Sequence, residues 1–338
     1  MKRALITILQ YVIFLGLGIW IIYHMLHELS PEQTDKLIAA LSGVNLWYIF
    51  PIFIVGFLSH FFRAVRWRYL LDTAGMRPTL ANTTFAVFIG YITNLAIPRG
   101  GEVAKCTVLA KYEKMPAHKM IGTIVAERAF DVFCLLIIAV LALLLEFSTI
   151  SGFVSGMMKD FRRKILEHQV ILAISIAAIA LLFVVAVIIY RRHRETKLGR
   201  LMKELAHGVL SIFHMKKRWE FIGYTALIWL MYLAQIYLGF MSLPDTAHLT
   251  PLAALVVLVY GSVGMIITPG GIGAYTWMVA QILTVYAIDD GPAQAFGWIA
   301  WAVQTVIIII LGVVSFLLIH PYNRKRDAKA AVDTKQDL

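Results

Sequence analysis

Residues 83–102 read TTFAVFIGYITNLAIPRGGE, and residues 252–273 read LAALVVLVYGSVGMIITPGGIG. Each stretch begins as an apolar helix and is then interrupted by a proline and paired glycines, which end a helix. Each apolar part is shorter than the ~20 residues that a membrane-spanning helix needs. We therefore expect two helices that break inside a membrane, and the rest of the fold prediction works outward from these two breaks.

The composition indicates a membrane protein rather than a soluble one. Of the 338 residues, 60% are hydrophobic and only 15% are charged, and the mean hydropathy is +0.76. Such a chain leaves no room for an extramembrane catalytic domain. Apart from the two broken segments, the apolar runs of spanning length cover about residues 5–26, 46–62, 120–145, 170–190, 221–243 and 295–319.

Loop charge sets the orientation of these segments, because basic loops stay on the cytoplasmic side of a membrane. The stretch 191–218 is strongly basic. It faces the cytoplasm, together with both termini, only if each broken segment enters and leaves by one face. The basic loop at 159–164 is an exception that this topology places outside. We expect a multi-pass protein of a prokaryotic plasma membrane, with the first hairpin entering from the cytoplasm and the second from outside.

The unit of span, hairpin and span occurs twice, in about residues 46–145 and 219–320, and in opposite orientation. Pro98 and Pro269 occupy corresponding places in the two units, and the flanking spans are separated by nearly the same interval as these prolines. Inverted repeats with broken helices are typical of transporters, whose binding site lies where the breaks meet. The alternative is that proline and glycine only kink ordinary spanning helices. The predicted fold class is an all-α polytopic membrane protein with six full spans and two oppositely oriented re-entrant hairpins in an inverted repeat.

The remaining segments belong to one transmembrane domain, residues 1–323. Between the repeats, apolar residues recur at helical spacing among lysines and arginines in about residues 195–216. This pattern predicts an amphipathic helix lying on an anionic leaflet. Residues 324–338 are polar, and we expect a disordered cytoplasmic tail.

Three ionisable residues, Glu127, Arg128 and Asp131, lie inside the apolar run 120–145. Each such charge costs ~2.5–3.5 kcal/mol to insert, so intramembrane charges mark substrate or proton pathways. Glu127 and Asp131 share a helix face, while Arg128 points about 100° away. The alternative is a neutralised structural triad that only clamps helices together.

The first hairpin tip contains Arg99, Gly100, Gly101 and Glu102. The glycines let backbone approach a ligand, and the helix that restarts there directs N–H groups and a positive dipole end into the break. Arg99 could bind a phosphate bidentately, with Arg128 as a second clamp. The alternative is that Arg99 pairs with Glu102. We expect Glu102, together with the two carboxylates of the 120–145 run, to balance charge or to carry protons.

The second tip is uncharged, which suggests a polar gate or path rather than a second phosphate clamp. Its candidate binding residues are Thr268, Gly270, Gly271 and Tyr275. In the last span, Trp301, Gln304 and Thr305 are candidates to line the route, although such residues often only hydrogen-bond across helices.

Three arginines, Arg63, Arg66 and Arg68, follow the span at 46–62 with aromatic residues between them. This pattern is typical of an anchor at the membrane interface, and recruitment of an anionic lipid is the alternative.

The chain carries no motif of a known enzyme class. HExxH, P-loop and GxSxG patterns are absent, and the glycines at 270–273 follow a membrane segment rather than a strand. The two cysteines have no metal-site spacing, so we expect no metal and no cofactor. The net charge of +11 lies in loops between apolar runs, which argues against nucleic acid as a partner.

Four short stretches together resemble one known family: NLAIPRGGE at 94–102, AERAFD at 126–131, RAVRWRYLL at 63–71 and TPGGIG at 268–273. The chain resembles the flippase-like transmembrane domain of lysylphosphatidylglycerol synthases over roughly residues 5–320, with the stand-alone members as the closer match. This resemblance implies translocation of a lipid with a charged headgroup through a cavity between two inverted halves. The full-length relatives carry a C-terminal aminoacyl transferase domain, which this sequence lacks, so we do not expect lysyl transfer.

An anionic cargo fits Arg99 and Arg128 better than an aminoacylated lipid does. The candidates are a polyprenyl phosphate, a glycosylated polyprenyl carrier or an acidic phospholipid. The alternative function is a non-transporting membrane subunit that presents a lipid-linked substrate to a glycosyltransferase or another envelope-biosynthesis enzyme.

Overall fold

The computed structural model describes residues 31–97, 100–146 and 215–336, together with residues 23, 27 and 212. All regular structure in these ranges is helical. The first half contains α2 (Pro31–Ser42), the short η1 (Leu46–Tyr48), α3 (Ile49–Thr73), α4 (Leu80–Ala96), α5 (Gly100–Glu113) and α6 (Ala117–Leu145). The second half contains α10 (Arg218–Met241), α11 (Pro251–Ile267), the short η2 (Pro269–Gly271), α12 (Ala274–Val285) and α13 (Asp290–Gln336).

Four of the described helices are long and apolar enough to cross a membrane, at Leu46–Thr73, Ala117–Leu145, Arg218–Met241 and Asp290–Lys329. They correspond to four of the six predicted spans. The other two, at 5–26 and 170–190, and nearly all of the predicted amphipathic helix at 195–216 lie outside the described residues.

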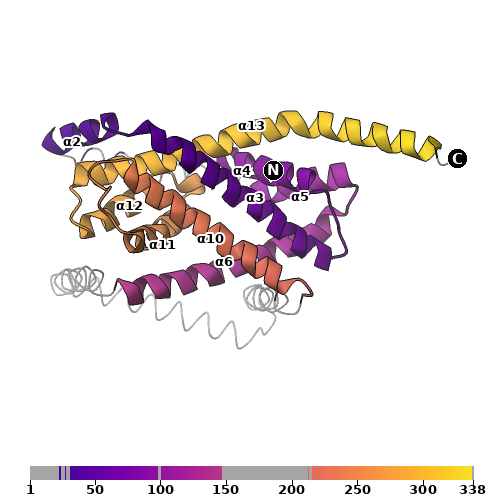
Figure 1. The fold of residues 1–338 in the computed structure, drawn as a ribbon, viewed down its shortest axis with the longest axis horizontal. Coiled ribbons are helices and arrows are strands. Elements are labelled where there is room, and N and C mark those ends of the chain that lie inside the picture. Colours follow the sequence, from indigo (N-terminus) through magenta and orange to yellow (C-terminus); the bar gives the residue numbers. More distant parts are fainter. Residues whose placement is uncertain are drawn as a thin grey trace, which may run out of the picture.

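The same order of elements occurs twice: a long helix, two short helices and another long helix. The two breaks fall where proline and glycine predicted them, after Ala96 and after Ile267. In Figure 1, α3 and α10 run side by side through the middle of the molecule, and the pair α4 and α5 lies at the opposite end from the pair α11 and α12. The short helices of each half also pack against a long helix of the other half, α4 against α13 and α11 against α6.

The two breaks meet inside the molecule. Helix α4 contacts η2, and a Cβ built on Gly270 would lie 3.5 Å from the side chain of Leu95. The contact between α3 and α10 is equally close, because a Cβ on Gly56 of α3 would lie 2.9 Å from Nε2 of Gln235 in α10. Buried apolar side chains form two large clusters in the described residues, one around Trp67 mainly from the first half and one around Phe296 mainly from the second half.

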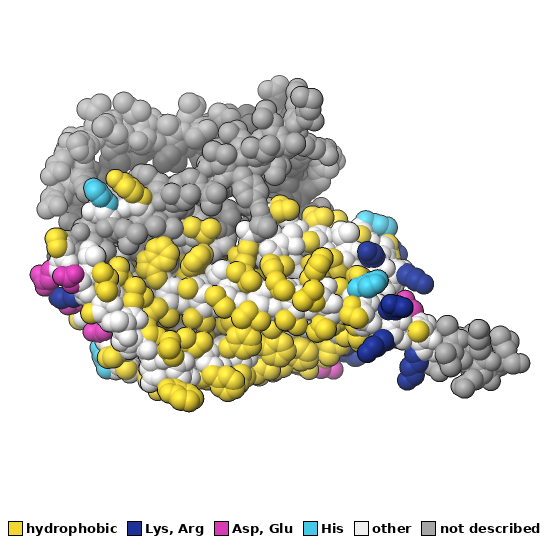
Figure 2. Space-filling model, turned by 90° about the horizontal axis from the view of Figure 1, so that it is seen from above, with side chains coloured by type: hydrophobic (Ala, Val, Ile, Leu, Met, Phe, Trp, Pro, Cys, Tyr) yellow, Lys and Arg dark blue, Asp and Glu magenta, His cyan; other side chains and the backbone are white. Residues whose placement is uncertain are grey.

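The surface has an apolar middle and charged ends, as the face in Figure 2 shows. Large apolar side chains such as Phe50, Leu136 and Phe316 are more than half exposed, as expected for side chains that face lipid rather than water. One end carries the exposed acidic residues Glu32, Asp35, Asp245, Asp289 and Asp290. The other end carries the exposed basic residues Lys111, Lys119, Arg218, Arg324 and Lys325.

Two predicted boundaries are wrong. Helix α3 does not end near residue 62 but continues to Thr73. Helix α13 continues to Gln336, so the tail that we expected to be disordered from residue 324 is helical there. Extending an existing helix needs no new nucleus, and the added stretch is rich in good helix formers. Its first turn is also tied down, since Arg326 donates to the Tyr112 carbonyl oxygen at 2.8 Å.

Candidate functional site

Five charged side chains meet in the interior, and we call them the ion cluster: Arg63 and Arg66 of α3, Lys105 of α5, and Glu127 and Asp131 of α6. Arg66 bridges both acids, with Nη1 2.7 Å from Asp131 Oδ1 and Nη2 3.3 Å from Glu127 Oε1. Lys105 Nζ lies 2.9 Å from Glu127 Oε2, and Arg63 Nη2 lies 3.2 Å from Asp131 Oδ2. The side chains of Arg66 and Glu127 are 0% and 1% exposed.

The ion cluster is unbalanced. Among the described residues, three cations face two carboxylates, which leaves a formal charge of +1 in a part of the protein that has apolar surroundings. The Nε atoms of Arg63 and Arg66 are buried and have no hydrogen-bond partner among the described residues. Uncompensated positive charge and unused guanidinium donors in a low-dielectric site favour binding of an anion.

Neighbouring side chains fix the cations in place. Arg66 Nη1 donates to Thr225 Oγ1 of α10 at 3.3 Å, so the second half of the chain also supports the cluster. Lys105 Nζ lies 3.9 Å from the centre of the Trp67 ring, a cation–π contact, and Trp67 Nε1 donates to Thr123 Oγ1 at 2.9 Å. The cationic side chains of the ion cluster are therefore held in defined positions by their neighbours.

Arg128 stands apart from the ion cluster. It points away from Glu127, as the helical period predicts, and its Nη2 lies 3.1 Å from Glu102 Oε1 of α5. The side chains of Arg128 and Glu102 are 44% and 32% exposed. The structure thus separates the predicted acids into two groups, Glu127 and Asp131 inside and Glu102 at an accessible position.

The first hairpin tip uses its glycines for packing. The Gly101 amide donates to Asn94 Oδ1 at 2.8 Å, and the Gly100 amide donates to the Ile97 carbonyl oxygen at 2.9 Å. A Cβ on Gly101 would collide with the carbonyl oxygen of Gly90, so α4 and α5 can approach this closely only with glycine there. These two amides are already bonded and are not free for an anion. Arg99, the predicted phosphate ligand, lies outside the described residues.

The second tip is a closed turn. Gly270 and Gly271 have φ of 66° and 72°, a region that favours glycine. Thr268 Oγ1 donates to the Ile272 carbonyl oxygen at 2.9 Å within the turn. Tyr275 packs against the glycine face of α11, where a Cβ on Gly261 would lie 2.8 Å from its ring.

The last long helix lies against this turn and against the centre of the molecule. Trp301 Nε1 donates to the Gly270 carbonyl oxygen at 2.8 Å, and the Thr305 hydroxyl donates to a carbonyl of its own helix. Gln304 forms hydrogen bonds with Gln235 of α10 and His60 of α3. Of the three residues predicted to line a route, Gln304 is therefore the one that joins other polar side chains.

Sequence reasoning missed three members of the ion cluster. We interpreted Arg63 and Arg66 as interfacial anchors, which is wrong because both are buried among carboxylates of α6. Arg68 alone has an anchor-like position, half-buried and donating to the Pro78 carbonyl oxygen at 3.0 Å. The sequence does contain a signal that the helix continues past residue 62. Arg63 and Arg66 are one turn apart, and Leu70 lies on the same helix face.

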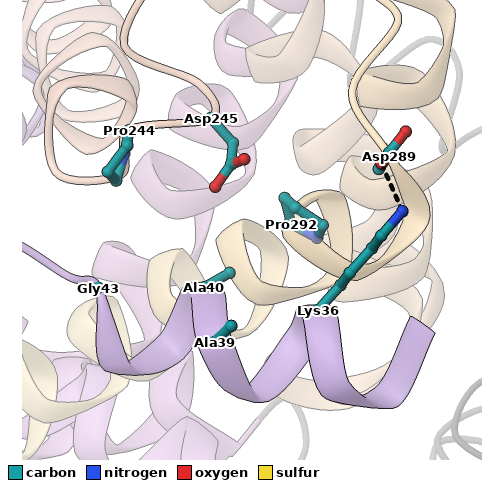
Figure 3. A pocket seen from close by; sticks show the side chains of 8 residues that line it. All are labelled: Lys36, Ala39, Ala40, Gly43, Pro244, Asp245, Asp289 and Pro292. Atoms are coloured by element: carbon teal, nitrogen blue, oxygen red, sulfur yellow. Dashed lines mark hydrogen bonds and ion pairs between the residues drawn. The ribbon is translucent and has the colours of Figure 1, made fainter. Parts of the chain in front are cut away.

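A separate cavity of about 290 Å³ lies at the acidic end (Figure 3). Its wall includes Lys36 of α2, whose Nζ lies 2.9 Å from Asp289 Oδ2 and 3.3 Å from Glu32 Oε1. The hydrogen bond to Asp289 and the nearby Glu32 raise the pKa of Lys36. These are exposed pairs, which attach α2 to the start of α13 but contribute little stability.

Comparison with known proteins identifies the family. Residues 7–312 match the family described as the lysylphosphatidylglycerol synthase TM region, and the chain belongs to this family, which confirms the resemblance seen in its motifs. It is 23% identical over 325 residues to a UPF0104 membrane protein of Methanocaldococcus jannaschii, an alignment that covers 87% of this chain and 91% of that protein. No solved structure matches the chain.

Proposed function

We propose that this member of the lysylphosphatidylglycerol synthase transmembrane family moves an anionic, phosphate-bearing lipid between the leaflets of a prokaryotic plasma membrane. The observation that carries the proposal is the ion cluster, which holds a net positive charge inside an apolar helical protein. A lipid phosphate needs a cationic partner to enter such an interior, because an unpaired charge there is costly.

The arrangement of helices supports a transport role. Under the proposed topology, the basic end of the molecule faces the cytoplasm, and both termini lie on that side. The pair α4 and α5 is then a re-entrant hairpin from the cytoplasm, and the pair α11 and α12 is one from outside (Figure 1). The six-span inverted repeat of this proposal also includes the two spans predicted at 5–26 and 170–190, which lie outside the described residues. The tips of the two hairpins touch beside the centre, which is where transporters of inverted-repeat type bind their cargo.

The charged residues have distinct parts in this proposal. Arg128 meets the headgroup first, because it is accessible and its carboxylate partner Glu102 can be exchanged for a phosphate. Arg99 at the tip assists in this step, whereas Gly100 and Gly101 serve the close packing of the tip. The ion cluster then provides the interior positive charge, and its two acids keep the cations apart and paired when no lipid is present.

At the other tip, Thr268, Gly270, Gly271 and Tyr275 shape the uncharged part of the path. Proton coupling belongs to the same proposal, since arrival of a phosphate at the ion cluster would favour protonation of Glu127 or Asp131. An imposed pH gradient across proteoliposomes that changes the transport rate would establish this coupling, whereas a rate independent of the gradient would exclude it.

The experiment is lipid movement in proteoliposomes that contain purified protein and a trace of fluorescent phosphatidylglycerol. Bleaching of outer-leaflet probe by dithionite reports exchange between leaflets. We expect R128Q to slow movement about tenfold, the loss that corresponds to one charge-assisted hydrogen bond. The control R77Q removes an exposed arginine paired with Asp72, outside the site, and should leave the rate unchanged.

Two results would contradict the proposal. One is wild-type protein that moves no labelled anionic lipid, and the other is an R128Q rate equal to that of R77Q. Tight lipid binding without any movement would instead favour a subunit that presents a lipid-linked substrate to an envelope-biosynthesis enzyme.

A further inference from the structure

We infer that His60, Gln235 and Gln304 form a second, uncharged subsite that binds hydroxyl groups of the transported headgroup. We call these three residues the amide subsite. The inference rests on the proposed function and deepens it, because it names the headgroup class: a phosphate diester that carries a neutral, hydroxyl-rich group.

The hydrogen bonds of the amide subsite run in one direction. Gln235 Nε2 donates to Gln304 Oε1 at 2.9 Å, so the other end of the Gln304 amide, Nε2, is directed at His60 Nε2, 3.0 Å away. An amide nitrogen can only donate, so His60 Nε2 accepts and the imidazole proton is on Nδ1.

That proton has no acceptor. His60 is 4% exposed, and its Nδ1 has no hydrogen-bond partner in the part of the chain that the structure describes. A buried donor without an acceptor is costly, and few native proteins keep one without a reason. An acceptor oxygen of a bound headgroup would satisfy it.

The amide subsite is the counterpart of the ion cluster in the second half of the chain. The interval from Arg63 to Gln235, and that from Asp131 to Gln304, nearly equal the interval between the two hairpin prolines. Arg63 and Asp131 form an ion pair at 3.2 Å, and the two glutamines form a neutral pair at 2.9 Å. Corresponding positions on long helices thus carry a charged pair in one half and a neutral pair in the other.

The two sites adjoin each other along α3. His60 lies one helical turn before Arg63, on the same face and further from the basic end. The ring of Tyr91 lies 4.7 Å from the His60 ring, and Phe88 meets it edge-on, so aromatic surface borders the polar groups. A headgroup whose phosphate reaches the ion cluster would therefore place its next atoms at the amide subsite.

The chemistry of the amide subsite selects hydroxyl groups. A carboxamide offers donors and an acceptor with no net charge, which matches an O–H group that both donates and accepts. A cationic headgroup would face the three cations of the ion cluster. A diester without hydroxyls would leave polar groups of the amide subsite unpaired, and a site built to hydrogen-bond a hydroxyl discriminates strongly against an analogue that lacks it.

The test uses two pairs of phosphate diesters of equal charge. The first pair is phosphatidylglycerol and phosphatidylethanol, with fluorescent acyl chains for the dithionite assay. The second is glucosyl-phosphoryl-polyprenol and methyl-phosphoryl-polyprenol, whose binding is measured by native mass spectrometry. We expect the wild type to favour the hydroxylated member of one pair about tenfold, and that pair identifies the source as a glycerophospholipid or a polyprenyl lipid.

Variants of the two glutamines test whether the preference for the hydroxylated lipid arises at the amide subsite. Q304L and Q235L should lower transport or binding of the hydroxylated lipid about tenfold and leave its partner lipid within about twofold. The matched control is Q281L, the same change at an exposed position of α12, which should keep the preference. Because the preference of the wild type is measured first, a variant that fails to fold does not block the test.

Equal handling of both members of each pair by the wild type would overturn the inference, and so would variants that slow both members alike. In either case, movement of phosphatidylethanol would leave the proposed function standing. Conversely, wild-type protein that moves no lipid but still binds hydroxylated diesters preferentially would refute the proposed function and support the amide subsite.

Discussion

Replacing Glu127 by glutamine tests whether the buried carboxylate of the ion cluster is needed to compensate the cations around it. The change keeps the size and shape of the side chain and removes one of two carboxylates that face three cations. The formal charge of the cluster then rises from +1 to +2. Lys105, 2.9 Å from Glu127 and 9% exposed, loses its carboxylate, and Arg66 retains only Asp131.

The expected loss is large because every partner is buried. Removing one member of a buried ion pair costs ~3–5 kcal/mol, since the remaining charge is left uncompensated. The same change at Glu102 removes a pair whose side chains are 44% and 32% exposed. Such a pair contributes ~1 kcal/mol or less. We therefore expect E127Q to be at least ~2 kcal/mol less stable than E102Q, the difference between these ~3 and ~1 kcal/mol values.

The assay is equilibrium unfolding in mixed micelles with a denaturing detergent, followed by circular dichroism. A double variant that also removes a cation gives a second comparison. K105M together with E127Q removes a cation as well as an anion and keeps an apolar stem over the Trp67 ring. Replacing a buried ion pair by apolar groups is often neutral, so the double variant should recover at least ~1 kcal/mol relative to E127Q. If E127Q were as mild as E102Q, or the double variant no more stable than E127Q, the charge argument would be refuted.

Three further changes test separate parts of the structure. R66K should lower stability by ~1–3 kcal/mol and slow lipid movement, because a lysine reaches one carboxylate where the guanidinium bridges two; an unfolding curve equal to that of the wild type would show that bridging is unimportant. G101A should unfold earlier because its methyl group collides with the backbone of α4, whereas G122A, whose added methyl group has no described atom within 4 Å, should gain ~0.5–1 kcal/mol from helix propensity. N323L should loosen the C-terminal part of α13, since Asn323 and Asn82 exchange side-chain hydrogen bonds of 2.8 and 2.9 Å, and faster amide hydrogen exchange after residue 320 would show it.

The sequence predicts the helices of this fold well where apolar composition and helix-breaking residues determine their ends. The long apolar runs and the two proline–glycine breaks are local features, and both breaks occur where expected. The end of α3 was missed because a first arginine after an apolar run resembles a membrane boundary. Whether an arginine meets water or a buried carboxylate depends on α6, a separate helix that comes much later in the chain.

For the candidate site, too, local sequence features were predicted and contacts between separate helices were not. Glu127 and Asp131 stand out because carboxylates inside an apolar run are rare, and the structure places both at the ion cluster. Their partners Arg63, Arg66 and Lys105 look like ordinary basic residues near helix ends in the sequence. Pairing between separate helices is a tertiary property, and neither spacing nor propensity reveals it. The same holds for His60 and Gln235, which acquire a role only where α3, α10 and α13 meet.

The difference between the two halves has a consequence for the proposed transport cycle. A carrier must bind its cargo strongly enough to draw it from the membrane and weakly enough to release it. If both halves carried charged pairs at their corresponding positions, a phosphate would be held electrostatically at two depths, and its release would be slow. Here the cationic residues Arg63 and Arg66 lie on one side of the centre, and neutral glutamines occupy the positions that correspond to Arg63 and Asp131. The phosphate then has one preferred depth, nearer the basic end, while hydroxyl contacts at the amide subsite orient the headgroup without adding charge attraction. In the proposed cycle, this difference in side chains between two halves of similar backbone order would allow the lipid to leave the site that attracted it.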